Sequence, residues 1–250
     1  MCELIEPEAL EPIVKHNSGI IVDVCDYSRY AKAHIPSAIH LQPQETFGAY
    51  PYKIGDLPNL NRIKEIIIKL GIIKHKPVYI YDDIGGVLAS RLIWLLDCVG
   101  YHNWILINGG LISWLKEGRA YQSTSSIDKT QEKKEIELKL KSLAHEYNFT
   151  KNQIISTLHS NDIIFWDSRS KGEFTGEIKK ATRAGHIPGS IHLDYRDLLN
   201  PNENLRIRSN VSEILEQNKI DPSKQIITYC HSNQRLSLIH ISEPTRHTSI

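Results

Sequence analysis

The sequence predicts an α/β fold built twice: two tandem domains, each a doubly wound parallel sheet flanked by helices. Two observations lead to this prediction. Short apolar runs of strand length alternate with segments that have helical spacing, as in sheets covered on both faces. The same series of motifs then occurs a second time in the same order. With 250 residues, the chain is long enough for two domains of about 120 residues, each with its own core.

Three pairs of matching segments and one pair of matching aromatic residues carry the repeat. Residues 20–23 match 164–167, and an aromatic residue follows each final aspartate by seven positions. Residues 33–41 match 185–193, and residues 78–82 match 226–230. The second copy also holds an eight-residue insertion, roughly 176–183, between its aromatic residue and its histidine. Duplication of one domain explains all four matches.

Within the first copy, the order of elements follows from the apolar pattern. Buried strands are predicted at 20–24, 78–81 and 104–107, because each is a continuous apolar run. Helices are predicted at 60–70 and at 89–99, where Gly100 ends the pattern, and a short helix is predicted to follow Asn108-Gly109-Gly110.

A polar segment separates the two copies. Residues 123–134 are charged and poor in apolar side chains, which is typical of a linker. We therefore divide the chain into a first domain at 1–122, a linker and lead-in at 123–145, and a second domain at 146–250. In parallel sheets ligands bind at the carboxyl ends of strands, and Asp82 and Cys230 occupy that position in the two copies.

These motifs resemble those of one family, the tandem-domain rhodaneses, and most closely the bacterial thiosulfate sulfurtransferases. The resemblance rests on Asp167 and Arg169, on Gly-His-Ile-Pro-Gly at 185–189, and on Thr-Tyr-Cys at 228–230 with Arg235 closing the loop. It implies a catalytic second domain and a first domain without the cysteine, which agrees with Asp82 standing opposite Cys230. It also implies that sulfur moves from thiosulfate through a cysteine persulfide to cyanide or a thiol, without a cofactor or a metal.

The chemistry of the loop supports Cys230 as the nucleophile. A thiol reacts as a thiolate, which needs an electropositive and partly open setting. A loop between a buried strand and a helix can turn its backbone N–H groups inward to hold an anion, and Arg235 adds a fixed positive charge. The predicted substrate-binding residues are His231, Ser232, Asn233, Gln234 and Arg235.

The length and composition of the Cys230 loop also bear on other possible functions. Related phosphatases place five residues between cysteine and arginine, whereas four separate Cys230 from Arg235. The loop lacks the glycine-rich sequence typical of mercaptopyruvate sulfurtransferases, although that activity stays an alternative. A persulfide carrier or sensor that serves a protein partner, and a catalytically inactive binding domain, are further alternatives.

The remaining cysteines and the motif histidines have structural interpretations. Cys98 lies in an apolar helical stretch and is expected to be a buried thiol, and Cys25 stands where the second copy has Arg169. Cys2 is expected on an exposed end. His34 and His186 are expected to fix a loop rather than to act in catalysis.

The acidic motifs are also expected to be structural. Asp167 and Arg169 are interpreted as an internal ion pair. Adjacent Asp82 and Asp83 are not expected to bind a metal, because neighbouring side chains on a strand end point apart. Arg183 and Arg196 fit the approach of an anion and a solvated surface equally well.

Composition excludes several partners. Thirty basic residues and 29 acidic ones leave a net charge of +1, so no nucleic acid is expected. No apolar run is long enough for a membrane span and the N-terminus is not a secretory signal, which predicts a cytoplasmic protein with reduced thiols. The expected partners are thiosulfate, a small thiophilic acceptor and a protein that accepts sulfur.

The C-terminal segment departs from the family after about Arg235. Residues 236–250 show no apolar stripe, contain Pro244, and resemble peptides produced when a sequencing-library adapter is translated. We therefore expect a truncated second domain, with this tail irregular or forming one short helix. We also expect Cys230 to be more exposed than Asp82.

Overall fold

A computed structural model describes residues 4–48, 57–73, 76–124, 149–231, 233–242 and 247–249. The chain divides into two compact units. The first unit comprises Glu3–Leu143 together with Pro201–Arg206, and the second comprises chiefly Ala144–Asn200 and Ile207–Ile250. The predicted linker at 123–134 lies outside the described residues from position 125 onward.

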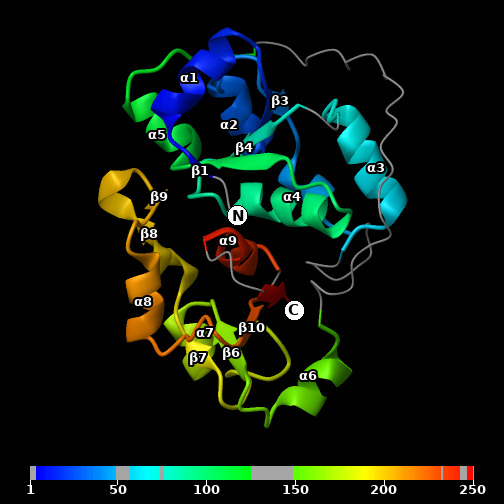
Figure 1. The fold of residues 1–250 in the computed structure, drawn as a ribbon, viewed down its shortest axis with the longest axis vertical. Helices are drawn as coiled ribbons and strands as arrows, with labels where there is room; N and C mark the ends of the chain where they lie inside the picture. Colours follow the sequence, from blue (N-terminus) through cyan, green and yellow to red (C-terminus); the bar gives the residue numbers. More distant parts are fainter. Residues whose placement is uncertain are drawn as a thin grey trace. The chain divides into compact units, whose positions relative to one another are not determined.

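The first unit is built around a five-stranded parallel sheet with the order β1-β5-β4-β2-β3 (Figure 1). In Figure 1, α1 and α5 lie on one side of the strands and α4 lies on the other. The elements, in chain order, are β1 (Leu4–Ile5), α1 (Pro7–Lys15), β2 (Ile20–Asp23), α2 (Tyr27–Lys32), β3 (Ile39–His40), η1 (Pro43–Thr46), α3 (Leu60–Lys69), β4 (Val78–Tyr81), α4 (Val87–Cys98), β5 (Trp104–Ile107) and α5 (Gly110–Lys116).

The burial of these elements follows their sequences. Every residue of β2 and β4 is buried, as their continuous apolar runs predict for strands covered on both faces. Helix α3 buries one stripe formed by Ile63, Ile66 and Ile67, whereas α4 buries every residue except Leu88. Among the described residues, no helix is both long enough and apolar enough to cross a membrane.

The second unit holds a four-stranded parallel sheet with the order β11-β10-β6-β7. The elements that follow the first domain are α6 (Lys151–Thr157), β6 (Ile163–Asp167), α7 (Lys171–Thr175), β7 (Ile191–His192), η3 (Tyr195–Leu198), β8 (Leu199–Asn200), η4 (Pro201–Glu203), β9 (Arg206–Ile207), α8 (Val211–Gln217), β10 (Gln225–Tyr229), α9 (Arg235–Ser242) and β11 (His247–Ser249). The predicted fold class, parallel α/β sheets flanked by helices, is confirmed.

The expectation for the tail is right about one short helix and wrong about the lack of a paired strand. Residues after Arg235 form helix α9, and β11 pairs in parallel with β10, with His247 opposite Ile226. Leu236, Leu238 and Ile239 are fully buried. The sequence misled because the buried residues of α9 are consecutive, Leu236 to Ile239 with the polar Ser237 among them, so they do not show the helical spacing that predicts an amphipathic helix. The structural argument for treating the tail as foreign fails with this expectation.

The two sheets place matching residues at the same edge. In the first unit Asp23 of β2 lies opposite Tyr81 of β4, and in the second Asp167 of β6 lies opposite Tyr229 of β10. Asp82 and Cys230 each come one residue later. Each therefore opens the loop at the carboxyl end of its sheet, where α/β folds bind ligands.

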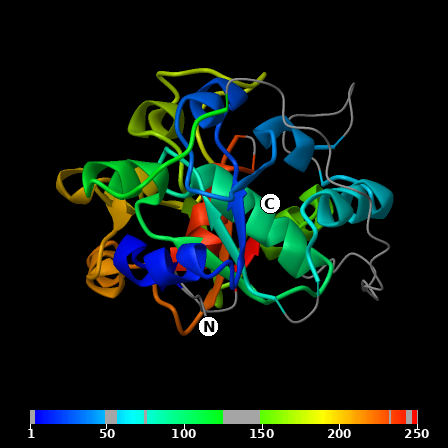
Figure 2. The same cartoon turned by 90° about the horizontal axis from the view of Figure 1, so that it is seen from above.

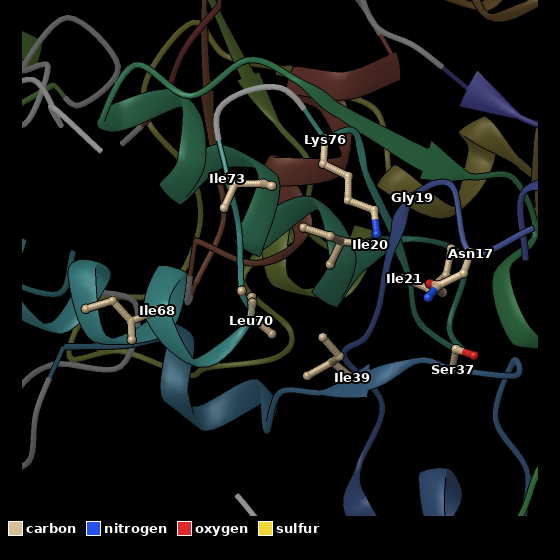
Figure 3. Close-up of a pocket in the computed structure, with 11 residues that line it drawn as sticks. Asn17, Gly19, Ile20, Ile21, Ser37, Ile39, Ile68, Leu70, Ile73 and Lys76 are labelled. Atoms are coloured by element: carbon tan, nitrogen blue, oxygen red, sulfur yellow. The ribbon is translucent and has the colours of Figure 1, made fainter. Parts of the chain in front are cut away.

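A groove of about 650 Å³ opens at the other edge of the first sheet (Figure 3). It is lined by Ile20, the first residue of β2, and by Ile68 and Ile73, which are 39% and 48% exposed. In Figure 3, the Lys76 side chain extends toward Ile20. Because β2 begins at this groove and ends at Asp23, the groove is separate from the loop that Asp82 opens.

Candidate functional site

Cys230 and Asp82 occupy equivalent places in loops of equal length. Cys230 directly follows β10 and Asp82 directly follows β4. The next helix begins five residues later in both units, at Arg235 in α9 and at Val87 in α4. Cys230 is partly exposed, whereas Asp82 is completely buried, as we expected from the sequence.

The Asp82 carboxylate is enclosed by the backbone of its own loop. Its Oδ1 accepts hydrogen bonds from the N–H groups of Ile84 (2.9 Å) and Gly86 (2.8 Å). Its Oδ2 accepts from Leu88 (2.6 Å) and Ala89 (3.1 Å). Burial raises the pKa of Asp82, while these hydrogen bonds act in the opposite direction. The loop and the first turn of α4 thus form a cradle whose donors converge on one anion.

The Asn-Gly-Gly motif after β5 holds this loop from behind. The Leu111 N–H donates to the Asp82 carbonyl oxygen at 2.9 Å. Gly110 has φ +52°, and a Cβ atom at this position would lie 2.1 Å from the same oxygen. Only glycine therefore permits this close approach.

The Cys230 loop leads from the end of β10 to the start of α9. His231 is exposed, Ser232 lies outside the described residues, and Asn233 has φ +52°, a left-handed conformation that asparagine tolerates. The carbonyl oxygens of Asn233 and Gln234 accept hydrogen bonds from the side chain and the backbone of Ser237. The loop is therefore joined directly to the first turns of α9.

Arg235 is held by a residue that sequence reasoning missed. Its Nη1 donates to Glu173 Oε2 at 2.7 Å and its Nη2 donates to Oε1 at 3.1 Å. The hydrogen bond from Arg235 is the main cause that lowers the pKa of Glu173 to about 2. Burial lowers the pKa of Arg235. The hydrogen bond to Glu173 and the charge of Cys230 together raise this pKa by more, so the net shift is upward. Arg235 is thus anchored to α7 at the point where the Cys230 loop meets α9.

The first unit has a matching tie with the charges reversed. Arg29 directly precedes the aromatic Tyr30, as Glu173 precedes Phe174. Arg29 Nε lies 3.6 Å from Oδ2 of Asp83, the second residue of the Asp82 loop. A signal for Glu173 was present in the sequence, but its capping box with Ser170 offers a local explanation that conceals the contact with Arg235.

The motif histidines have the structural role expected of them. His34 Nδ1 donates to the Tyr30 carbonyl oxygen at 2.8 Å, and the two rings stack with centroids 4.0 Å apart. His186 repeats both contacts with Phe174, at 2.8 Å and 3.8 Å. Each histidine therefore pins its loop to the aromatic residue of the preceding helix.

The predicted ion pair between Asp167 and Arg169 is present. Arg169 Nε donates to Asp167 Oδ1 at 2.9 Å and its Nη2 donates to Oδ2 at 2.6 Å. The same Nη2 donates to the Gly185 carbonyl oxygen at 2.8 Å. The pair therefore connects the end of β6 to the start of the Gly-His-Ile-Pro-Gly segment.

Two other cysteines are unsuited to nucleophilic chemistry. Cys25 and Cys98 are buried, and burial raises the pKa of both thiols, that of Cys98 to about 12. Cys2 lies outside the described residues. Within the described part of the chain, no cluster of three or more histidine, cysteine, aspartate or glutamate residues could hold a metal ion.

Fold and site together define a duplicated parallel α/β protein with a cysteine at the carboxyl end of one sheet. The chain belongs to the rhodanese-like domain family, whose model matches residues 6–117 and 150–243. It is 32% identical to a thiosulfate sulfurtransferase of Pseudomonas aeruginosa over 243 residues, covering 95% of this chain and 86% of that protein. It is 33% identical to the Azotobacter vinelandii thiosulfate sulfurtransferase, with the same coverage.

A solved structure has the same fold across both chains. The Escherichia coli 3-mercaptopyruvate sulfotransferase superposes with a TM-score of 0.82 over 100% of this chain and 97% of that one. The two sequences are 19% identical, so this likeness concerns the fold.

Proposed function

We propose that this protein is a sulfurtransferase that moves the sulfane sulfur of thiosulfate to a nucleophilic acceptor through a persulfide on Cys230. Membership of the rhodanese-like family and the similarity to two bacterial thiosulfate sulfurtransferases support this activity. The observation that carries it is the matched pair of loops. One is closed around the Asp82 carboxylate, and the other presents a partly exposed cysteine at the equivalent position.

The Asp82 loop indicates how such a loop treats an anion. Four backbone N–H groups converge on its carboxylate, two on each oxygen. A loop of the same length after β10 would direct donors toward the Cys230 sulfur and the group attached to it. Backbone N–H groups at a helix N-terminus favour a thiolate and stabilise an oxyanion that forms beside it.

The reaction has two balanced half-steps. The Cys230 thiolate attacks the outer sulfur of thiosulfate, the bond between the two thiosulfate sulfurs breaks with its electron pair, and sulfite leaves. The enzyme then carries a persulfide. In the second step, a cyanide ion or a thiolate attacks the terminal sulfur, and the sulfur–sulfur bond of the persulfide breaks to restore the Cys230 thiolate.

Arg235 contributes through position as well as charge. Its two Nη groups are engaged by Glu173, so its charge is partly compensated before substrate binds. We assign the binding of the sulfonate group to the loop formed by His231, Ser232, Asn233 and Gln234, with Arg235 fixing where that loop meets α9. The alternative donor, 3-mercaptopyruvate, would use the same cysteine. The thiols of Cys25, Cys98 and Cys230 are free, which favours a reducing compartment such as the cytoplasm.

The test is thiocyanate formation from thiosulfate and cyanide. Cys230→Ser is expected to lower kcat by at least about 10³-fold, because a serine hydroxyl cannot form the persulfide. Cys98→Ser is the matched control and should retain turnover, because Cys98 is a buried thiol in α4. Turnover that survives in Cys230→Ser, or wild-type turnover with 3-mercaptopyruvate but not with thiosulfate, would contradict the proposal.

A further inference from the structure

The insertion in the second unit, residues 176–183, is an exposed and positively charged segment; we refer to it as the basic insertion. Residues 177–183 are all exposed. The segment carries three cations and a single acid, Glu177. Within the described residues, none of the three cations has an ion-pair partner. They are Lys179, Lys180 and Arg183.

The basic insertion is anchored to the helix that ties the cysteine loop. The Ile178 N–H donates to the Gly172 carbonyl oxygen of α7 at 2.9 Å. Its two ends meet, since a Cβ atom on Gly176 would lie 3.2 Å from the backbone nitrogen of Gly185. Helix α7 also carries Glu173, which binds Arg235 at the end of the Cys230 loop. The insertion and the cysteine loop are therefore attached to the same short helix.

The first unit is closed at the equivalent place. His34 follows Tyr30 without an insertion, is 4% exposed, and exchanges backbone hydrogen bonds with Gln122. His186 in the second unit is exposed. Within the described residues, the second unit thus combines a partly open cysteine loop with an exposed basic segment on the helix that ties this loop.

We propose that the basic insertion is a docking surface for an acidic protein or peptide thiol that takes sulfur from the Cys230 persulfide. This inference rests on the proposed function. The unpaired cations of the insertion complement a partner whose thiol is flanked by carboxylates. The apolar side chain of Ile178 lies next to these cations in the sequence and is 48% exposed. It favours a macromolecular partner over a small dianion, because only a partner of some size covers an apolar side chain.

The probes are two short synthetic peptides, each with one cysteine, flanked by aspartate and glutamate in one and by lysine and arginine in the other. Wild-type enzyme is first loaded with thiosulfate, and transfer of the persulfide sulfur to each peptide is then measured at low salt. The acidic peptide is expected to react about 10-fold faster than the basic one, with the preference lost at high salt. Lys179→Glu with Lys180→Glu should reverse the preference.

The matched control places the same charge change in the first unit. Lys64 and Lys116 are exposed, and Lys64→Glu with Lys116→Glu should leave the preference intact. Ile178→Ser should slow transfer to the acidic peptide several-fold, without changing thiocyanate formation at saturating thiosulfate and cyanide.

Two outcomes would overturn the inference, and a third would overturn the proposed function instead. If Lys179→Glu with Lys180→Glu slows sulfite release from thiosulfate as much as transfer to peptide, the surface attracts the donor and does not dock an acceptor. An unchanged peptide preference in this variant would also exclude docking. Failure of the wild-type protein to release sulfite at all would instead reject the sulfur transfer on which the inference depends.

Discussion

The loop after β4 and the loop after β10 begin one residue beyond equivalent strands and end at helices that begin after the same interval. One holds a completely buried carboxylate that saturates four backbone donors, and the other holds a partly exposed thiol. The first loop therefore closes around its own carboxyl group, whereas the second presents the Cys230 sulfur at the equivalent place. The two loops share their length and their place in the sheet but no residue, since residues 82–86 read Asp-Asp-Ile-Gly-Gly and residues 230–234 read Cys-His-Ser-Asn-Gln.

The ties that hold the two loops differ in a related way. The second unit uses a bidentate and largely buried pair between Glu173 and Arg235, with side-chain exposures of 4% and 19%. The first unit uses a single contact of 3.6 Å between Arg29 and Asp83, which are 35% and 25% exposed. The bidentate and more buried tie therefore belongs to the loop that opens on Cys230, and the single longer contact belongs to the loop that opens on Asp82.

The largest expected effect concerns the Asp82 cradle. Asp82→Ala should lower the free energy of unfolding of the first unit by on the order of 3 kcal/mol, because four backbone N–H groups, two of them buried, lose their acceptor. Urea denaturation measures this effect. Cys230→Ala is the matched change in the other loop and should cost less than about 1 kcal/mol. Equal losses in both variants would mean that the cradle does not depend on its internal anion.

A smaller effect is expected for the tie between Glu173 and Arg235. Glu173→Gln should lower stability at pH 7 by roughly 1–3 kcal/mol, because it leaves a largely buried guanidinium without its charge partner. Since the pKa of Glu173 is lowered from 4.5 to about 2, its stabilisation is complete above pH 4.5 and is lost as the pH falls toward 2. The difference between variant and wild type should therefore shrink over that range.

The matched control for this tie is Arg29→Ala in the first unit. It removes a more exposed and longer contact, so it should cost less than about 1 kcal/mol. Stability is followed by urea denaturation at several pH values. A difference for Glu173→Gln that stays constant from pH 7 to pH 2 would show that its carboxylate charge does not contribute.

The sequence was sufficient for the repeat and for the strands β2, β4 and β5 with their copies β6 and β10, whereas β1 and β11 were not predicted. Continuous apolar runs predicted β2, β4 and β5 closely, since strands buried on both faces tolerate few polar residues. The assignment of Cys230 and its loop as the site stays a prediction. Its position directly after β10 agrees with the expectation that the chemistry lies at the strand end.

Contacts between residues far apart in the chain could not be predicted from the sequence in this way. Glu173 and Arg235 are separated by 62 positions, and nothing local to either residue requires the other. The Asp82 cradle depends on the left-handed backbone of Gly85 and Gly86, which the sequence permitted but did not require. Helix α9 was missed because its buried residues are consecutive and include the polar Ser237, so that the usual amphipathic signal was absent.

The smallest effect on the free energy of unfolding is expected at the ends of β2 and β6. There one substitution, Asp23→Asn, is expected to stabilise the protein, whereas the variants above destabilise it. Asp167 is paired with Arg169, whereas Asp23 has Cys25 in the equivalent place and interacts with the Tyr81 hydroxyl instead of a guanidinium. Its Oδ1 accepts from the Cys25 N–H at 2.7 Å. Burial raises the pKa of Asp23 above its usual value of 3.8. The folded state therefore binds this proton more tightly than the unfolded chain, and stability falls as the pH rises from about 3.8 through the folded pKa.

Asp23→Asn keeps the acceptor for the Cys25 N–H and removes the ionisable oxygen. It should therefore raise the free energy of unfolding at pH 7 by less than about 1 kcal/mol and should flatten its dependence on pH above 4. Asp167→Asn is the matched change and should be destabilising, because it leaves the Arg169 guanidinium without its carboxylate. Urea denaturation of both variants between pH 4 and pH 8 gives the two signs. A loss of stability in Asp23→Asn would mean that the Asp23 carboxylate is stabilised by charge in the fold, and the contrast between the two strand ends would then fail.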